Sequence, residues 1–242
     1  MKSSFHIFAH RGASHIYPEN TLPAFREAIR LGATGLELDV QLSKDGHPVV
    51  IHDEYLDRTT DGKGLVKNHT LQELKELSAG AWFHDQFKKV KIPTLEEVLK
   101  KARPIPILLN IELKNLLLPL SNLEKEVIRL IEKYDMTQRI ILTSFKPDSI
   151  KQIRQLNREI TTAFMFFGKL DQPWKMALEL EAPLIQPPMS SLTPELVENC
   201  RKYGLVVYPY HVDKWIDIGK ALQCKVNGVI TTYPERVGKF VE

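Results

Sequence analysis

Short apolar runs rich in β-branched and aromatic residues alternate with amphipathic stretches along nearly the whole chain of 242 residues. Such short runs predict strands, and the stretches between them carry helix-start signals. The predicted strands cover residues 5–9, 35–42, 105–113, 139–143, 160–166, 183–186, 205–210 and 228–231. Eight strands separated by helices, in a chain of this length, favour an α/β fold of the TIM-type (β/α)8 barrel over an open doubly wound sheet.

Four threonines mark predicted helix starts. Thr21 and Thr193 stand directly before helical patterns, the second with Pro194 at the first helical position. Thr70 and Thr94 are each followed three residues later by a glutamate, which is the capping-box pattern. We therefore expect a helix to begin after each of these threonines.

The segment 40–51 departs from this alternation, because two extended runs are joined by a short turn that contains Asp-Gly. Such a connection joins antiparallel strands, since a parallel crossover needs about a dozen residues or more. The second run is thus predicted to fold back as an arm on the strand 35–42. Pairing of Ser43 with Pro48 places Asp39 opposite His52, and a slip of one or two residues leaves those two side chains near one another.

The stretch after the arm, at about 53–92, is predicted to be a small insertion with one helix, after which the barrel resumes. The sequence has no internal repeat and no sign of a second domain. Residues 1–242 are therefore expected to form a single barrel domain that carries this insertion.

Composition and charge narrow the classes of protein. Hydrophobic residues make up 43% and charged residues 26% of the chain, which excludes an extensively disordered or low-complexity architecture. The formal net charge is +3 with both signs interleaved, so nucleic acid is not an expected partner. The two cysteines form no CxxC pattern, which argues against a zinc site and a disulfide framework. The N-terminal residues do not resemble a signal peptide, and no apolar run approaches the ~20 residues of a membrane span, which predicts a cytoplasmic protein without stable membrane insertion.

Three acidic residues, Glu37, Asp39 and Glu112, interrupt apolar predicted strands. Glu37 and Asp39 are two apart, so their side chains point to one face, about 7 Å apart along the backbone. Buried alone, such carboxylates would repel one another and lose hydration, and a divalent cation would remove both costs. The all-oxygen set suits Mg²⁺, Ca²⁺ or Mn²⁺. The alternative is that the acids form salt bridges with Arg11 and Lys114.

His10 and His52 are the candidates for proton transfer, because both are predicted at strand ends beside these acids, where the functional side chains of a barrel gather. Arg11 and Lys114 add fixed positive charge, which suits a phosphate oxyanion. Phosphodiester cleavage is the simplest reaction that uses two histidines, a metal and a cationic clamp. One histidine would act as base and the other would protonate the leaving alkoxide.

Several separately placed motifs resemble the signature of the glycerophosphodiester phosphodiesterase family. These motifs are His10-Arg11-Gly12-Ala13, Tyr17-Pro18-Glu19-Asn20-Thr21, Glu37-Leu38-Asp39-Val40, Lys44-Asp45-Gly46, Val49-Val50-Ile51-His52-Asp53 and Ile111-Glu112-Leu113-Lys114. The likeness is strong over the first half of the chain and continues collinearly to the end. It implies a phosphodiesterase barrel that converts a small glycerophosphodiester into sn-glycerol 3-phosphate and an alcohol.

The resemblance also implies roles for individual residues. By it, the divalent cation is held by Glu37, Asp39 and Glu112, the acid/base pair is His10 and His52, and the phosphate contacts are Arg11 and Lys114. Asn20 lies at the edge of the site or makes a structural hydrogen bond, and Phe145 lines the substrate cleft or packs in the core.

The second half of the chain departs from the family pattern. Tyr210-His211-Val212-Asp213 stands where the family usually has Trp-Thr-Val-Asn. Tyr210 retains an aromatic wall for the substrate site. The changed polarity at His211 and Asp213 is expected to affect the alcohol or glycerol end of the substrate.

Three other functions stay open at the level of sequence. A phospholipase C- or D-like barrel would need an apolar rim, for which 116–118 and 164–167 are candidates, although we expect them to be buried in the core or against the insertion. A catalytically silent phosphate-binding module would be expected to lack a histidine or an acid of the set, and all are present. An enolising metal enzyme on the same barrel has no evident use for both histidines.

Overall fold

Strands and helices alternate through the residues that the computed structural model describes, 5–116 and 121–241. The strands are β1 His6–His10, β2 Gly35–Leu42, β3 Pro48–Val50, β4 Leu108–Leu113, β5 Ile140–Ser144, β6 Thr161–Met165, β7 Leu184–Gln186, β8 Val206–Val207 and β9 Gly228–Thr231. The helices are α1 Leu22–Arg30, α2 Leu71–Glu76, α3 Leu95–Ala102, α4 Leu123–Lys133, α5 Pro147–Leu156, α6 Pro173–Glu179, α7 Pro194–Lys202, α8 Trp215–Gln223 and α9 Pro234–Val241. Short 3-10 helices cover Val66–Asn68, Asp85–Phe87, Thr137–Arg139 and Met189–Ser191.

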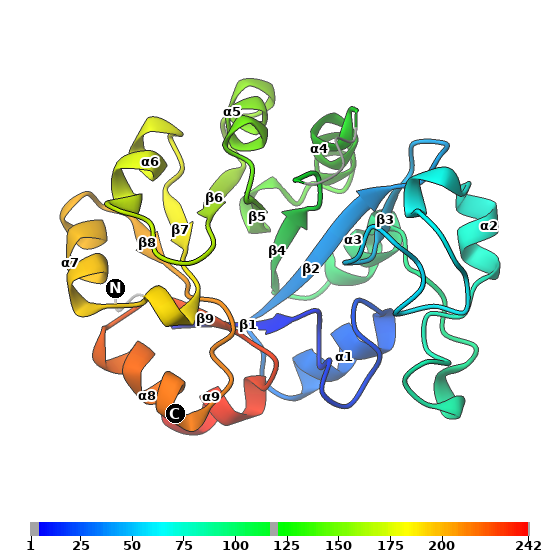
Figure 1. Cartoon of the computed structure of the whole chain (residues 1–242), viewed down its shortest axis with the longest axis horizontal. Helices are drawn as coiled ribbons and strands as arrows, with labels where there is room; N and C mark the ends of the chain where they lie inside the picture. The colour runs from blue at the N-terminus through cyan, green and yellow to red at the C-terminus, as the bar shows by residue number, and fades with distance from the viewer. Residues whose placement is uncertain (1–4, 117–120, 242) are drawn as a thin grey trace.

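The parallel strands form a barrel that closes almost completely. Neighbouring strands pair in the order β8-β7-β6-β5-β4-β2-β1-β9, and Tyr210 bridges to Ile230 where the two ends of the sheet meet. Most helices form a ring around the strands, whereas α2 lies beyond this ring near β3 (Figure 1). The predicted TIM-type barrel is therefore confirmed.

The predicted helix starts are confirmed as well. The side chains of Thr21 and Thr193 each accept a hydrogen bond from a backbone N–H in the first turn of the following helix. Thr70 and Thr94 form complete capping boxes, in which the N3 glutamate accepts from the backbone N–H of the threonine. These caps satisfy N–H groups that an α-helix leaves without intrahelical partners.

The arm β3 pairs antiparallel with β2, but its register is shifted by one residue from the expected one. Leu42, not Ser43, stands opposite Pro48, and the N–H of Ile51 donates to the carbonyl of Asp39. Pro48 has no N–H to donate, and Ser43 instead closes the turn, where its N–H and its hydroxyl both bond to the backbone of His47. Asp39 therefore lies opposite Ile51, and His52 follows beyond the paired residues.

Successive residues of the barrel strands face two different cores. Along β1, Ile7 and Ala9 pack outward against the helices, whereas Phe8 belongs to a cluster inside the barrel. A Cβ atom on Gly35 would lie 2.3 Å from the Phe8 ring, so the glycine provides the space that this ring fills. The same alternation turns every second residue of β2 and β4 into the barrel, among them the acidic residues.

The segment between β3 and α3 has a small core of its own. Its buried apolar members are Val49, Ile51, Leu56, Val66, Leu74, Ala79 and Ile92. The first two belong to the arm and its continuation, so this core anchors the chain on both sides of His52.

Candidate active site

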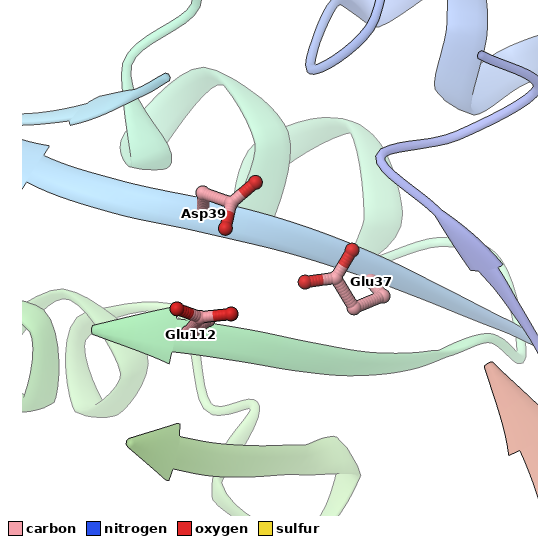
Figure 2. Close-up of side chains that lie close together, drawn as sticks. All are labelled: Glu37, Asp39 and Glu112. Carbon is pink, nitrogen blue, oxygen red and sulfur yellow. The ribbon is translucent and has the colours of Figure 1, made fainter. Parts of the chain in front are cut away.

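Three carboxylates converge inside the barrel toward the C-terminal ends of β2 and β4. Glu37 and Asp39 come from β2 and Glu112 from β4, and the strand register places Asp39 directly beside Glu112. One oxygen atom from each residue lies within 4.8 Å of the others, and the three groups point toward one another (Figure 2). Each of the three residues is at most 6% exposed. The spacing in the sequence thus produces a buried cluster of hard oxygen ligands.

Two cationic side chains contact this acidic cluster. The Lys114 Nζ lies 2.6 Å from Glu112 Oε1 and 3.8 Å from Asp39 Oδ1. The Arg11 Nε lies 3.3 Å from Asp39 Oδ2, and the backbone N–H of Arg11 donates to Glu37 Oε2 at 3.0 Å. The salt bridges that sequence offered as the alternative to a metal are therefore present. Two cations beside three carboxylates leave one negative charge without a counterpart.

The pKa values of the three carboxyl groups diverge. Burial, followed by the like charges of Asp39 and Glu112, raises the pKa of Glu37 well above its ordinary value. Burial also raises the pKa of Glu112, although Lys114 opposes the shift. For Asp39, burial is outweighed by Arg11 and Lys114, so its pKa lies below the ordinary value. The negative charge of Glu37 is the least favourable of the three, and a cation bound at the cluster would stabilise it.

The two histidines come from different segments: His10 from the end of β1, and His52 from the residues after the arm β3. His10 ends β1, with its Nε2 4.0 Å from Glu37 Oε2 and its ring edge-on to His211 at 4.8 Å between centroids. Burial, then the charges of Arg11 and His211, lower the pKa of His10 well below its ordinary value. His52 makes its close contact through Nδ1, 2.6 Å from Asp53 Oδ1, rather than with Asp39 as the expected register implied.

A cavity of about 520 Å³ opens over these groups. Its polar lining includes His10, Arg11, Glu37, His52, Asp53, Glu54, Glu112, Lys114 and His211. Aromatic rings form another part of the wall: Phe145 stacks on Phe167 with centroids 3.9 Å apart and meets Tyr210 edge-on. The Tyr210 hydroxyl donates to the Phe166 carbonyl at 2.9 Å, which fixes this ring in place. The cavity therefore joins an ionic floor to an aromatic wall.

The model of the glycerophosphoryl diester phosphodiesterase family matches residues 10–236, a span that includes both histidines, the three acids and the aromatic wall. The chain belongs to this family. A glycerophosphodiester phosphodiesterase of Caldanaerobacter subterraneus subsp. tengcongensis is 42% identical over 235 residues, which cover 97% of each chain. Another, of Bacillus subtilis, is 34% identical over 94% of this chain and 83% of the relative.

Solved structures of phosphodiesterases share the same architecture. A glycerophosphodiester phosphodiesterase from Agrobacterium tumefaciens is 30% identical, with a TM-score of 0.86 over 97% of this chain and 99% of the other. A phosphodiesterase from Oleispira antarctica, in complex with the product sn-glycerol-3-phosphate, is 29% identical, with a TM-score of 0.87 over 97% and 95% of the two chains. This chain is accordingly a hydrolase of the glycerophosphodiester phosphodiesterase type, and the enzyme class predicted from the motifs is confirmed.

Two residues that the family motifs singled out lie outside the cavity lining. The Asn20 amide donates to Asp39 Oδ2 at 2.8 Å while its carbonyl accepts from the Asp39 backbone N–H, so Asn20 makes the structural hydrogen bond and faces away from the substrate space. Asp213 accepts from the Thr231 hydroxyl and the Thr232 backbone N–H. It therefore braces the loop after β9, whereas its neighbour His211 reaches the cavity.

The candidate rim residues divide between the core and the cavity. Phe164 and Phe166 pack in the outer core, but Phe167 is 64% exposed and lines the cavity, as does Leu116. Tyr55, from the segment after the arm, is 56% exposed at the same mouth. Leu117 and Leu118 lie outside the described residues. No helix within residues 5–116 and 121–241 combines the length and apolar character needed to cross a membrane.

Sequence reasoning missed one cation near the site. Arg58 binds Asp53 and Glu19, and Glu19 also accepts from Arg11 at 2.8 Å. Arg58 and Glu19 are 39 residues apart, and no periodic pattern links them, so spacing carries no signal for this contact.

Proposed function

We propose that this chain hydrolyses glycerophosphodiesters to sn-glycerol 3-phosphate and an alcohol by acid/base catalysis at a divalent cation. The observation that carries the proposal is a cavity lined by two histidines, two cationic side chains and two members of a buried carboxylate trio, Glu37 and Glu112, with Asp39 completing the trio. The family match and the product complex of the Oleispira antarctica relative support the substrate class.

Glu37, Asp39 and Glu112 are the residues that would hold the cation. Their donor atoms are all carboxylate oxygens, so the site fits Mg²⁺, Ca²⁺ or Mn²⁺. Burial, together with neighbouring like charges, raises the pKa values of Glu37 and Glu112, and a bound cation would favour their charged forms. A bound cation would supply Lewis acidity toward a phosphate oxygen. Asn20 holds the Asp39 carboxylate in place through two hydrogen bonds.

The two histidines suit different halves of the proton transfer. Because its pKa is lowered, His10 is neutral near pH 7 and can accept a proton from the water molecule that attacks phosphorus. His52 then protonates the leaving alkoxide. Its Nδ1 is engaged by Asp53, which orients the ring and leaves Nε2 for the substrate.

Arg11 and Lys114 would bind the phosphate, since both line the cavity next to the acids. Each is a permanent cation, because the neighbouring carboxylates raise its pKa above the ordinary value in spite of burial, which acts in the opposite direction. Phe145 and Tyr210 would contact the organic part of the substrate. This arrangement stabilises the charge of the phosphate in the transition state.

A second candidate substrate is a lysophospholipid, a glycerophosphodiester whose glycerol part carries an acyl chain and which would yield lysophosphatidic acid and the head-group alcohol. The exposed side chains of Tyr55, Leu116 and Phe167 at the cavity mouth favour it, because an alkyl chain leaving the cavity would cover them. This reaction would use the same catalytic groups.

We also propose that residues 1–242 form one domain with an insertion at about 53–92. The main hydrophobic cluster extends without a break from Ile7 to Val237, so strands from both ends of the chain share it. The insertion contributes the separate small core described above.

A substrate panel tests the function. Glycerophosphocholine, glycerophosphoethanolamine, glycerophosphoglycerol, glycerophosphoinositol and a lysophospholipid are incubated with the protein, and released glycerol 3-phosphate or choline is measured with and without a chelator. We expect glycerol 3-phosphate from at least one diester, loss of activity with chelator and recovery with Mg²⁺, Mn²⁺ or Ca²⁺. The His10→Ala variant is the matched inactive control. Full turnover by demonstrably metal-free protein would contradict the metal assignment.

A further inference from the structure

A chain of ion pairs connects the two sides of the catalytic cavity through one guanidinium group. Arg58 donates to both oxygens of Asp53 at 2.7 and 2.8 Å and to both oxygens of Glu19 at 2.8 Å. Asp53 holds the His52 ring, and Glu19 accepts from Arg11. The order along the chain of contacts is thus Arg11, Glu19, Arg58, Asp53 and His52.

Arg58 itself does not line the cavity, and neither does Glu19. The Arg58 side chain is 44% exposed, whereas that of Glu19 is 12% exposed. An exposed ion pair contributes little to stability as a rule, but a planar guanidinium that binds two carboxylates in a bidentate way fixes their orientation. Hydrogen bonds from Arg58 lower the pKa of Asp53 to about 2, so Asp53 is an anion whenever the enzyme works near neutral pH.

We propose that Arg58 is a positioning residue: it orients His52 through Asp53 and Arg11 through Glu19. This inference rests on the proposed roles of His52 in protonating the leaving group and of Arg11 in binding phosphate. Arg58 belongs to the segment after the arm, whereas Arg11 and Glu19 belong to the loop after β1. The guanidinium therefore sets the distance between the two parts of the site that do not share a strand.

The physical reason is that, among the described residues, Arg58 is the only cation that bonds to both carboxylates. Without it, Asp53 would keep only the contact with His52, and Glu19 only that with Arg11. Both side chains would gain rotational freedom, and the histidine ring would lose the fixed orientation that proton transfer requires. The Arg58→Lys variant retains the positive charge, but its ammonium group lacks the planar geometry that binds two carboxylates in a bidentate way.

The test separates orientation of His52 from general damage to the protein. Turnover of glycerophosphocholine, with a poor leaving group, is compared with that of glycerophospho-p-nitrophenol, whose leaving group needs little protonation. We expect Arg58→Ala to lower kcat on the choline ester by roughly 10–100-fold, the scale observed when a group that orients a functional residue is lost. The nitrophenyl ester should be affected much less, and Arg58→Lys should fall between Arg58→Ala and the wild type.

A double-mutant cycle with His52→Ala completes the test. In the His52→Ala background, Arg58→Ala should change the ratio of the kcat values on the choline and nitrophenyl esters by less than about twofold, because the imidazole that Arg58 positions is gone. Arg30→Ala is the matched control, since Arg30 is an exposed arginine whose only ion-pair partner among the described residues is Glu27 on its own helix. Thermal unfolding of every variant shows whether it is folded. If Arg58→Ala does not fold, turnover of the two esters is compared with Arg58→Lys instead.

The outcomes distinguish this proposal from the proposed function. Equal losses on both substrates in Arg58→Ala, or an undiminished change of the ratio in the His52→Ala background, would show that Arg58 does not orient His52 and would overturn the proposal. If His52→Ala itself turns over both substrates at the wild-type rate, the proposed role of His52 fails and the positioning proposal falls with it.

Discussion

Replacement of Glu37 by glutamine tests the carboxylate trio with the smallest change of shape. Glutamine keeps an oxygen that can accept from the Arg11 backbone N–H. It removes the carboxyl group whose pKa is raised well above its ordinary value by burial and by the charges of Asp39 and Glu112. In the metal-free protein, that charge is unfavourable. We therefore expect Glu37→Gln to stabilise the metal-free protein while it weakens cation binding.

The size of the effect follows from the distance between the charges. Two carboxylate oxygens within 4.8 Å repel by roughly 3 kcal/mol at an effective dielectric constant of about 20, and the nearby cations offset much of this. A net gain of about 1 kcal/mol would raise Tm by about 2–4 °C in a protein of this size. For the wild type, a cation at 100 times its Kd adds about 2.7 kcal/mol, or roughly 5–11 °C.

The pH dependence has a defined sign. Because the pKa of Glu37 is higher in the folded than in the unfolded state, the folded protein binds this proton more tightly. Stability from this group is complete below the unfolded pKa of about 4.3 and is lost as pH rises through the folded pKa, by up to about 1.4 kcal/mol per pH unit. The advantage of Glu37→Gln over the wild type should thus grow from about pH 4.3 toward neutrality.

Thermal unfolding in EDTA and in Mg²⁺, Ca²⁺ or Mn²⁺, at several pH values, measures all three effects. Glu124→Gln is the matched control, because Glu124 is also buried but binds Asn115 and Ser149 away from the trio. It should leave the cation-induced rise in Tm unchanged. A Glu37→Gln protein that keeps the full cation-induced rise, or is less stable than the wild type in EDTA near pH 8, would refute the reasoning.

Three further predictions concern catalysis and the insertion. His10→Ala and His52→Ala should each lower kcat on alkyl esters by roughly 10²–10⁴-fold, and a nitrophenyl ester should partly rescue only His52→Ala. Steady-state rates on both esters measure this, and equal losses of both variants on both esters would contradict separate acid and base roles. Arg11→Ala should lower kcat/KM for every member of the substrate panel by a similar factor, whereas Tyr210→Ala should change their ranking; the opposite pattern would place the phosphate and alcohol subsites the other way round. Leu74→Ala, in the insertion core, should destabilise the insertion by about 2–5 kcal/mol, and this should speed proteolysis within 53–92 and lower kcat. The cation-induced rise in Tm should stay, and its loss would show that the acidic trio depends on the insertion.

The features that sequence predicted are those that depend on neighbours along the chain. A spacing of two places Glu37 and Asp39 on one face of a strand whatever the rest of the fold does, and the capping boxes at Thr70 and Thr94 involve residues three apart. The register of the arm was wrong by one residue, because Ser43 closes the turn and is not free to pair. One residue of slip is enough to change which side chain His52 meets.

The contacts between distant segments were beyond the reach of pattern analysis. The orientation of the Asn20 amide toward Asp39 depends on where the loop after β1 lies against β2, which no local rule specifies. The same is true of Arg58, whose two carboxylate partners come from different segments. Such polar contacts depend on tertiary packing, and that packing appears in the sequence only as general hydrophobicity.

The main core around the barrel and the small core of the insertion support different groups of the site. His10 and the acidic trio stand on barrel strands, whose outward residues belong to the main core, whereas His52 is held between the arm and an insertion that packs around its own small core. We therefore expect loosening of the insertion to displace His52 and to leave the ligands of a cation in place. Arg58 opposes that movement, because it ties Asp53 to Glu19 and hence to the loop that carries Arg11. Proton transfer by His52 should accordingly depend on the stability of the insertion, and cation binding should not.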